Sequence, residues 1–310
     1  MPGMDGHVGL VDRSERGKLA LTGEQAAELL DGQVTNDVGA LAPGEGLFAA
    51  YLTNKGKMLG DVRVLRSEEG IHLDCERVGL QALFDILRRG SIGWQAELHK
   101  RTLQEGLLSL LGPGARALVG ADDLPGVEHA HRWLEVDGIG ARAVVTDLGV
   151  DLLCDAANTD ALVAALLARG AERWDEAAAE VLRVEAGRPR YGVDLDDSVI
   201  PQEAGLNDRA VSFTKGCYVG QETVARLRWR GKPNRHLRGL RLEEPVAAGA
   251  ELRTADGKVV GALSSPVESE RLGPIALALV RREAEPGDVV EVVDDAGAAH
   301  RAQVVELPFV

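Results

Sequence analysis

The chain has 310 residues, of which 45% are hydrophobic and 27% charged, proportions typical of a folded globular protein. Its formal net charge of −14 at pH 7 repels phosphate groups, which argues against general nucleic-acid or anionic-membrane binding. The three cysteines, Cys75, Cys154 and Cys217, are too few and too far apart for a disulfide framework. The apolar runs at 161–168 and 275–280 are too short to span a bilayer, and with no signal-peptide pattern we expect a cytoplasmic protein.

The first third of the chain predicts a mixed α/β unit. Thr22 is a candidate helix N-cap, and Gln25 completes a capping-box pattern before a short helix. Alternating apolar residues then predict strands at 47–53 and 58–66, joined by the turn N-K-G-K, and a third strand follows. Residues 77–89 carry apolar side chains at helical spacing and predict an amphipathic helix.

A second mixed unit opens near residue 107. Its strand-like segments are followed by two helical segments, at 158–169 and roughly 175–186. The second helix is predicted to end where Gly187 fits the position after the helix and Pro189 cannot continue it.

The last quarter of the chain reads as short β segments separated by turn residues such as D-G, which predicts a small antiparallel barrel or sandwich. We therefore predict an α+β protein with domains at residues 1–106, 107–235 and 236–310, the second ending with the K-G-C-Y-V-G-Q-E segment. Strand–turn–strand pairs outnumber βαβ patterns, so the first two sheets should be mixed or antiparallel.

Cys217 is the candidate functional thiol. Cys75 and Cys154 occupy inward positions of alternating strands, where cysteine acts as a small apolar side chain. Cys217 instead stands in a glycine-flanked stretch, two residues after Lys215, which would favour a thiolate. The alternative is a cysteine that merely fills a turn. A Cys–His hydrolase is weakly supported, because no histidine or aspartate accompanies the thiol in sequence.

Three other polar stretches have both a functional and a structural reading. Residues 226–238 hold six basic residues and no acid, which fits either an anion clamp with Trp229 available for stacking, or a cationic strand face. The aspartates of residues 194–197 are read as a solvated acidic loop rather than a metal site. Asn36 could line a pocket, although turn chemistry alone explains it.

At this point the sequence resembles a known family. K-G-C-Y-V-G-Q-E followed by T-V-A-R, at residues 215–226, is similar to the signature of YgfZ-type folate-binding proteins, relatives of the glycine-cleavage aminomethyltransferase, or T-protein. Further matches follow in the same order, and the resemblance covers nearly the whole chain. They are D-G-Q-V-T-N-D-V (31–38), N-K-G-K-M (54–58), L-R-V-E-A-G…Y-G-V-D (182–194) and I-P-Q-E (200–203).

The resemblance implies three domains arranged as a ring around a central channel, two mixed α/β units and a C-terminal β-barrel. It also implies that the protein binds tetrahydrofolate or a one-carbon derivative, with no permanently bound metal. The implied role is the assembly or repair of iron–sulfur clusters in client enzymes, including tRNA-modifying enzymes. The implied partners are then the folate and iron–sulfur client or carrier proteins, without direct nucleic-acid or membrane contact.

Site residues are carried over onto matching positions. The implied catalytic group is Cys217, with Lys215 and Tyr218 beside it. The remaining matched or chemically suited positions are proposed to bind the cofactor: Asn36, Asp61, Arg183, Glu185, Tyr191, Gln221, Glu222, Arg226 and Trp229.

Departures from the T-protein pattern favour the YgfZ type. The T-protein's G-I-L-D-D segment, which bears a catalytic aspartate, appears here as K-M-L-G-D, so only Asp61 of the acidic pair remains. The position of its folate-contacting glutamate holds the shorter Asp151. Whether a reaction is catalysed stays open at this stage. The alternatives are an aminomethyltransferase or other folate-dependent one-carbon transferase, and a non-catalytic scaffold.

Overall fold

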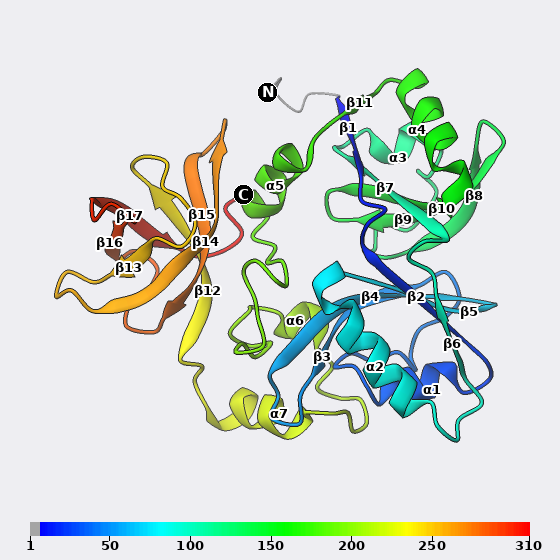
Figure 1. Cartoon of the computed structure of the whole chain (residues 1–310), viewed down its shortest axis with the longest axis horizontal. Helices are drawn as coiled ribbons and strands as arrows, with labels where there is room; N and C mark the ends of the chain where they lie inside the picture. The colour runs from blue at the N-terminus through cyan, green and yellow to red at the C-terminus, as the bar shows by residue number, and fades with distance from the viewer. Residues whose placement is uncertain (1–6) are drawn as a thin grey trace. The chain divides into compact units, whose positions relative to one another are not determined.

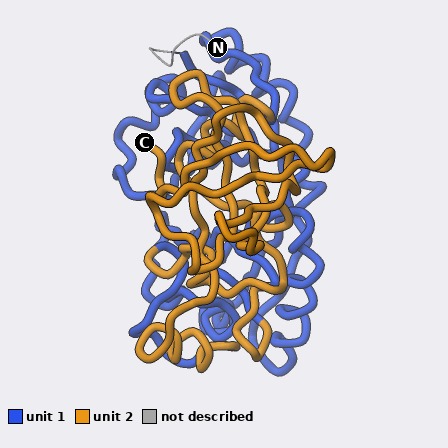
Figure 2. The backbone as a smooth tube through the Cα atoms, turned by 90° about the vertical axis from the view of Figure 1, so that its left-hand side faces the viewer, with its two compact units in different colours: residues 1–52, 59–176, 209–219 blue, residues 53–58, 177–208, 220–310 orange. Residues whose placement is uncertain are grey.

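The computed structural model describes residues 7–310 (Figure 1). The chain divides into two compact units, drawn in different colours in Figure 2. Within the described residues, unit 1 comprises the chain up to residue 52, residues 59–176 and residues 209–219. Unit 2 comprises residues 53–58, 177–208 and 220–310. In the part of the chain that the structure describes, no helix is long and apolar enough to cross a membrane.

Unit 1 contains a five-stranded sheet in the order β3-β4-β5-β2-β6. Its strands are β2 (Gly17–Thr22), β3 (Gly46–Leu52), β4 (Met58–Ser67), β5 (Gly70–Cys75) and β6 (Glu97–Lys100). Two helices, α1 (Ala26–Asp31) and α2 (Leu80–Gly90), the latter preceded by the 3-10 turn η1 (Arg77–Gly79), pack their leucines on one face of this sheet. The predicted strand pair and the amphipathic helix are confirmed.

The capping prediction at Thr22 is wrong. Thr22 ends β2, where its Oγ1 lies 2.8 Å from Nε2 of His99, and α1 begins four residues later with Gln25 as its N-cap. Gln25 is held by Gln95, since its backbone N–H donates to the Gln95 carbonyl and its side-chain oxygen accepts the Gln95 N–H. This long-range contact decides where the helix starts.

Unit 1 also contains a six-stranded mixed sheet in the order β11-β1-β7-β10-β9-β8. Its strands are β1 (Val8–Asp12), β7 (Glu105–Leu111), β8 (His131–Val136), β9 (Ile139–Thr146), β10 (Gly149–Asp155) and β11 (Ala171–Arg173). β1 pairs antiparallel with β7 and parallel with β11, so the first described strand belongs to the sheet built mainly from residues 105–173.

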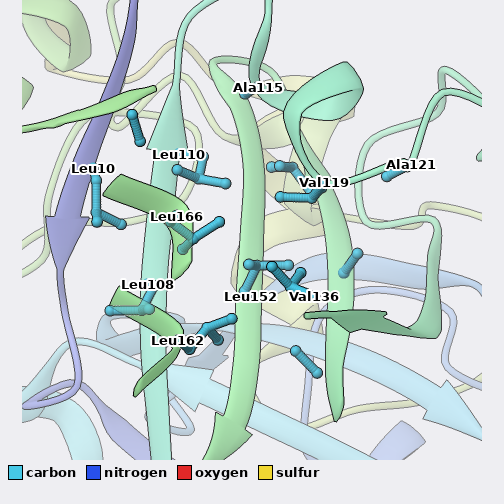
Figure 3. Packing of buried hydrophobic residues seen from close by; sticks show 14 of the residues in the cluster. Leu10, Leu108, Leu110, Ala115, Val119, Ala121, Val136, Leu152, Leu162 and Leu166 are labelled. Atoms are coloured by element: carbon cyan, nitrogen blue, oxygen red, sulfur yellow. The ribbon is translucent and has the colours of Figure 1, made fainter. Parts of the chain in front are cut away.

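Helices α3 (Ala115–Leu118) and α4 (Thr159–Ala168), the latter preceded by η2 (Ala156–Asn158), cover one face of the six-stranded sheet. Leu162 and Leu166 of α4 lie against Leu108 and Leu152 of the central strands (Figure 3). Cys154 belongs to this cluster and Cys75 to the core of the other sheet, as their alternation predicted.

The other faces of the two sheets meet each other inside unit 1. Leu65 of β4 packs with Leu107, Val144 and Leu153 of the six-stranded sheet. Polar residues that alternate with these apolar ones share the contact, as Arg63 of β4 reaches Asp151 of β10. We call this zone the inter-sheet layer. Its mixture of leucines and buried charges is what positions the chemistry described below.

Unit 2 contains a closed six-stranded barrel, so the barrel alternative is confirmed over the sandwich. Its strands, in the order β12-β15-β14-β13-β16-β17, are β12 (Arg235–Leu242), β13 (Glu251–Arg253), β14 (Val259–Ser269), β15 (Gly273–Arg281), β16 (Val289–Val293) and β17 (Ala299–Val305). The helices before the barrel are α5 (Glu176–Glu185), α6 (Asn207–Ala210) and α7 (Gln221–Arg230). Gly187 follows α5 with φ +65°, as the predicted helix end requires.

Candidate functional site

Lys215 is anchored at the end of helix α1. Its Nζ donates to the backbone carbonyls of Asp31, Asn36 and Val34, at 2.5, 2.9 and 3.1 Å, and lies 2.9 Å from the Asp31 carboxylate. The side chain is 1% exposed. Burial lowers the pKa of the Lys215 ammonium, while its hydrogen bond to the Asp31 carboxylate opposes that shift. This lysine therefore satisfies the last carbonyl of α1 and two carbonyls of the turn after it, and fixes the segment that carries the thiol.

Cys217 is exposed, two residues after this anchor. Tyr218 beside it is buried, its ring lies under the Lys215 ammonium at 5.4 Å, and burial raises the pKa of its phenol to about 12. The two neighbours are thus fixed while the thiol itself reaches solvent. Such a thiol is accessible to a reaction partner.

Asn36 helps to hold the preceding segment. Its side-chain amide donates to the backbone carbonyls of Phe48 and Arg209, at 2.8 and 3.3 Å. Thr35 next to it donates its hydroxyl to the Ala210 carbonyl at 2.5 Å. Within unit 1, hydrogen bonds from Thr35 and Asn36 therefore hold residues 209–219 against the turn that follows α1.

Asp61 is the buried carboxyl of strand β4, at 6% exposure. Burial and the nearby negative charge of Glu76 raise the pKa of Asp61 to about 7, although Arg16 and Arg209 pull it downward. A carboxyl poised near neutral pH can both hold and release a proton, which is the property of a general acid or base.

The residue before it, Gly60, explains the loss of one acid from the pair. A Cβ at position 60 would lie 2.0 Å from the hydroxyl oxygen of Tyr51. Tyr51 is fully buried and donates its hydroxyl to the Gly79 carbonyl at 2.8 Å. The space that a second acidic side chain would need is thus filled by a tyrosine.

A buried ionic network continues from Asp61 along the inter-sheet layer. Arg63 donates to Asp74 and to Asp151, each at 2.5 Å, and Ser109 donates to Asp151 at 2.7 Å. Arg16 bonds the other oxygen of Asp74 at 3.1 Å. The pKa of the Asp74 carboxyl is held well below its usual range, because Arg63 and Arg16 outweigh the opposing effect of burial. Asp151 is consequently engaged by arginine and serine.

Arg209 lies in a third group of unit 1. Its guanidinium pairs with Glu128 and stands over the ring of Phe48, 4.6 Å from the ring centroid. The Phe48 ring also stacks with His129, at 6.5 Å between centroids. This group presents a cation and a flat aromatic surface, and its arginine is close enough to lower the pKa of Asp61.

In unit 2, Arg183 and Asp194 form a separate buried pair. Nη1 of Arg183 donates to Asp194 at 2.8 Å, and Nη2 donates to Ser265 of the barrel at 2.7 Å. Asp194 also accepts the hydroxyls of Ser264 and Ser265, at 2.5 and 2.7 Å. The interpretation of residues 194–197 as a solvated loop is therefore wrong at Asp194, because its carboxylate links helix α5 to the barrel.

Glu185 has the same linking role within unit 2. At 3% exposure, it accepts bonds from Ser269 and Arg271 of the barrel region. Tyr191 lies nearby in sequence, in a one-residue β-bridge with Leu195. The matched residues 183–191 thus lie where α5 and the loop after it join the barrel.

Residues 221–230 form helix α7, so the interpretation of the basic stretch as a strand face is wrong for Arg226, Arg228 and Arg230. It holds for Arg235 and Arg238, which lie on β12 and pair with Glu203 and Glu306. Gln221 and Glu222 open the helix, and Glu222 pairs with Arg226 one turn later at 2.7 Å. Trp229 is 74% exposed, with the Arg228 guanidinium 6.0 Å from its ring centroid. Arg226, Arg228 and Arg230 stand at every second position, a spacing typical of a strand, yet this segment forms a helix.

The predicted residues thus fall into separate groups. Lys215, Cys217, Tyr218 and Asn36 come together in unit 1, where Asp61 heads the inter-sheet layer. The other predicted residues belong to unit 2: Arg183, Glu185, Tyr191, Gln221, Glu222, Arg226 and Trp229. Among residues 7–310, no cluster of three or more His, Cys, Asp or Glu side chains is placed to hold a metal ion.

Sequence reasoning missed Arg16, Glu76 and Arg209, the charged neighbours that set the proton affinity of Asp61. Arg16 stands in the turn between β1 and β2 and Arg209 in the one-turn helix α6, and neither belongs to a motif. One signal was available, namely that polar residues recur at every second position in β4 and β5, at Asp61 and Arg63 and again in H-L-D. This spacing indicates a polar face on a buried strand.

Two family models match the chain: the GCVT N-terminal domain over residues 3–215, and the glycine cleavage T-protein C-terminal barrel domain over residues 235–310. An aminomethyltransferase of Streptomyces coelicolor is 32% identical, with 97% of this chain and 86% of the relative aligned. A putative chloroplastic transferase of Arabidopsis thaliana is 28% identical, over 98% of this chain and 72% of the relative. The crystal structure of glycine cleavage system aminomethyltransferase T from Bartonella henselae superposes with a TM-score of 0.87 at 26% identity, covering 98% of this chain and 86% of that one.

Proposed function

Because this chain belongs to the family defined by the GCVT N-terminal domain and the T-protein C-terminal barrel, we propose that it binds tetrahydrofolate or a one-carbon derivative. We further propose that this binding supports the assembly or repair of iron–sulfur clusters in client enzymes, including tRNA-modifying enzymes. The second step rests on the YgfZ-type octapeptide at residues 215–222. We propose that the protein acts in the cytoplasm.

The observation that carries the folate proposal is Asp61. It is a buried carboxyl whose pKa is raised to about 7 by burial, and it lies near Arg16 and Arg209, the second of which stands over the ring of Phe48. A reduced folate offers a flat pteridine ring with N–H donors and an anionic glutamate tail. The groups around Asp61 fit that chemistry, because a carboxyl accepts N–H donors, Phe48 offers a stacking surface and Arg209 offers a positive charge.

When bound, the folate would supply a one-carbon unit or a carrier for one. Asp61 would hold a proton at its carboxyl oxygen or accept one from a ring nitrogen, and its raised pKa matches such exchange at neutral pH. Arg16 and Arg209 would limit that rise, so that the carboxyl still ionises in the physiological range. The leucines of the inter-sheet layer would keep bulk water from the same zone.

Cys217 would act as the meeting point with an iron–sulfur client or carrier protein. Its exposure suits contact with another macromolecule, and the Lys215 anchor holds the segment in a fixed position. Tyr218 would position the thiol without touching the ligand. Arg226 and Trp229 of α7, one cation and one aromatic, are proposed as cofactor-binding residues by their chemistry alone.

The matched residues of unit 2 have proposed roles within that unit. Arg183 and Glu185 would act by holding the barrel and helix together, because both are already bonded to barrel side chains. Tyr191, Gln221 and Glu222 are proposed as cofactor-binding residues on the resemblance of their positions alone. Asn36 would hold the turn that carries Lys215.

A folate-dependent aminomethyltransferase is the second candidate. Asp61 favours it, because this chain keeps one acid of the pair and gives it a pKa suited to proton transfer. The 32% identity to an aminomethyltransferase supports it as well. Against it stands Gly60, where Tyr51 fills the place of the other acid.

The folate step is tested by titrating the protein with 5-formyltetrahydrofolate in a calorimeter. We expect saturable binding that Asp61→Asn weakens by about tenfold or more, as expected for the loss of a charge-assisted hydrogen bond. Asp122→Asn changes an exposed loop carboxylate and should leave binding unchanged. Heat that is not saturable at millimolar ligand would refute folate binding.

The iron–sulfur step is tested in a deletion strain by measuring the activity of a tRNA methylthiolating enzyme. We expect wild type to restore activity, and Cys217→Ser to restore little of it while the protein remains folded and binds folate. Full restoration by Cys217→Ser would show that the thiol is dispensable. Turnover with a lipoylated aminomethyl carrier and tetrahydrofolate would instead favour the transferase.

A further inference from the structure

A cavity of about 350 Å³ lies at the edge of the inter-sheet layer, entirely within unit 1. Its polar lining comes from β5, β7, β8, β9, β10 and the segment before β7: His72, Arg101, Glu105, Trp133, Arg142 and Asp155. The register explains the gathering, because Trp133, Arg142 and Leu153 are direct cross-strand partners on one face. The cavity is separate from Asp61, since His72 pairs with Leu65, four residues or about 13 Å along β4.

The cavity contains buried polar atoms that lack partners. Across residues 7–310, no hydrogen-bond partner is placed for His72 Nε2 or Arg142 Nη1, while Glu105 Oε2 lies 3.3 Å from His72 Nδ1. His72 is 7% exposed and Arg142 8% exposed, so bulk water does not satisfy them freely. Buried polar groups are almost always bonded, and leaving one unbonded costs stability. Two such atoms on side chains that line one cavity indicate that something else bonds them.

The charged residues that line the cavity include equal numbers of positive and negative groups. Arg101 and Arg142 contribute two positive charges, and Glu105 and Asp155 two negative ones. His72 stays neutral near pH 7, because burial lowers its pKa to about 3. A ligand that suits this lining therefore carries both a negative and a positive group, and needs little net charge of its own.

Trp133 supplies an apolar wall. Its indole is 58% exposed, and the Arg142 guanidinium lies 5.5 Å from the ring centroid. A large exposed tryptophan beside a buried arginine is the pair of residue types most enriched at binding surfaces. The volume is near the lower end of the range for ligand pockets, which fits a small molecule rather than a folate.

We infer that this cavity is a binding site for a free α-amino acid. The ligand carboxylate would accept hydrogen bonds from Arg142 and the approaching Arg101, while its ammonium group would donate to Glu105. The neutral His72 ring faces the Glu105 carboxylate through Nδ1, which therefore carries the proton, so His72 Nε2 would accept a hydrogen bond from the ligand ammonium. Trp133 would cover the side chain. His72 Nε2 and Arg142 Nη1 then each gain a partner of matching polarity.

The test is a thermal-shift and calorimetric screen of the intact protein against each common amino acid at millimolar concentration. Propionate and ethylammonium serve as matched probes that carry only one of the two charged groups. We expect at least one amino acid to bind saturably and to change tryptophan fluorescence, and the single-charge probes to bind at least tenfold more weakly.

Variants locate the binding. Arg142→Gln and Glu105→Gln should each raise the dissociation constant about tenfold or more. Trp133→Phe should keep binding measurable by calorimetry but remove the fluorescence change, which guards against a variant that fails to fold. Arg88→Gln, an exposed arginine of α2, is the control and should bind as wild type does.

Several outcomes would overturn the inference. One is that no amino acid binds at these concentrations, which would assign the unpartnered atoms to ordered water. Another is propionate binding as tightly as the best amino acid. A third is an amino acid whose affinity is the same in wild type, Arg142→Gln and Glu105→Gln.

Discussion

Two polar groups share the inter-sheet layer and differ in how completely they are bonded. Around Arg63, the carboxylates of Asp74 and Asp151 are bonded by guanidinium and hydroxyl groups at 2.5 to 3.1 Å. In the group around Arg142, its own Nη1 and His72 Nε2 lack hydrogen-bond partners within the described chain. The two groups use the same strands, since Asp74 and His72 both lie on β5.

This difference distinguishes a group of residues that stabilises the fold from one that can bind a ligand. A fully bonded buried network rigidifies the contact between two sheets, and each member depends on the others. A partly bonded group is costly unless a ligand or water completes it. Asp61 stands between these cases, because it is buried beside the closed network but keeps a pKa of about 7.

The largest effect is expected from breaking the closed network with Arg63→Met. The change leaves Asp74 and Asp151 buried without their main counter-ion, and losing one partner of a buried pair costs about 3–5 kcal/mol. Urea unfolding at pH 7 measures it. The matched Arg253→Met removes an arginine paired with Glu251 at the surface, where the expected cost is below about 1 kcal/mol. Equal costs would remove the distinction between the buried and the surface pair.

The same network limits the stability of the fold at acid pH. Asp74 has a folded-state pKa below its unfolded value of about 3.9, so its stabilising effect is complete above that pH and is lost as the pH falls through the folded value. Arg63→Met should therefore flatten the loss of stability of the wild type below about pH 4.

Asp61 should affect the pH dependence of stability in the opposite direction, and Asp61→Asn tests this. Burial raises the pKa of Asp61 to about 7, so the folded state holds the proton more strongly than the unfolded chain, and stability falls as pH rises from about 4 to 7. The amide avoids this cost, and the variant should be more stable at pH 8 by up to about 4 kcal/mol. Melting temperatures at pH 4 and pH 8 measure the difference. A variant that is destabilised equally at both pH values would contradict the raised pKa.

Gly60→Ala tests the packing beside Asp61. Its methyl group would overlap Tyr51, and overpacking a buried site costs about 1–3 kcal/mol. In a Tyr51→Ala background the steric part of the cost should disappear while the strain of the backbone at φ +156° remains, so the double-mutant cycle should show a coupling energy of about 1 kcal/mol or more. Additive costs would mean that Tyr51 does not exclude a side chain at this position.

The smallest effect on stability is expected for Cys217→Ser. The thiol is exposed, and surface substitutions usually change the free energy of unfolding by less than about 0.5 kcal/mol. Guanidinium unfolding of wild type and variant measures it. A loss of more than about 1 kcal/mol would show that the thiol is part of the packing of the segment, in contrast to its fixed neighbours.

The sequence predicted the elements whose patterns are local. Residues 47–53 and 58–66 alternate clearly enough to predict β3 and β4, and Gly187 marks the end of α5. The prediction of where α1 starts failed because Gln95, seventy positions away, holds Gln25. Long-range pairing of this kind leaves no local pattern.

The candidate site was predictable only where a motif carried it. The octapeptide identified Cys217, but the target of Lys215 depends on carbonyls near residue 31, which the sequence does not connect to it. Arg142 and His72 looked like ordinary strand residues. Their burial follows from sheet stacking, which periodicity within one strand does not specify.

The position of β1 has a consequence for how the protein is made. The six-stranded sheet pairs Gly9 with Leu111 and Val8 with Ala171, whereas the strands β2 to β6 lie between residues 17 and 100. During synthesis the five-stranded sheet can therefore assemble first, while β1 stays unpaired until β7 (Glu105–Leu111) has left the ribosome and lacks its second neighbour until β11 (Ala171–Arg173) follows. Closing such distant contacts is slow, and the waiting strand is the segment that a chaperone would need to protect.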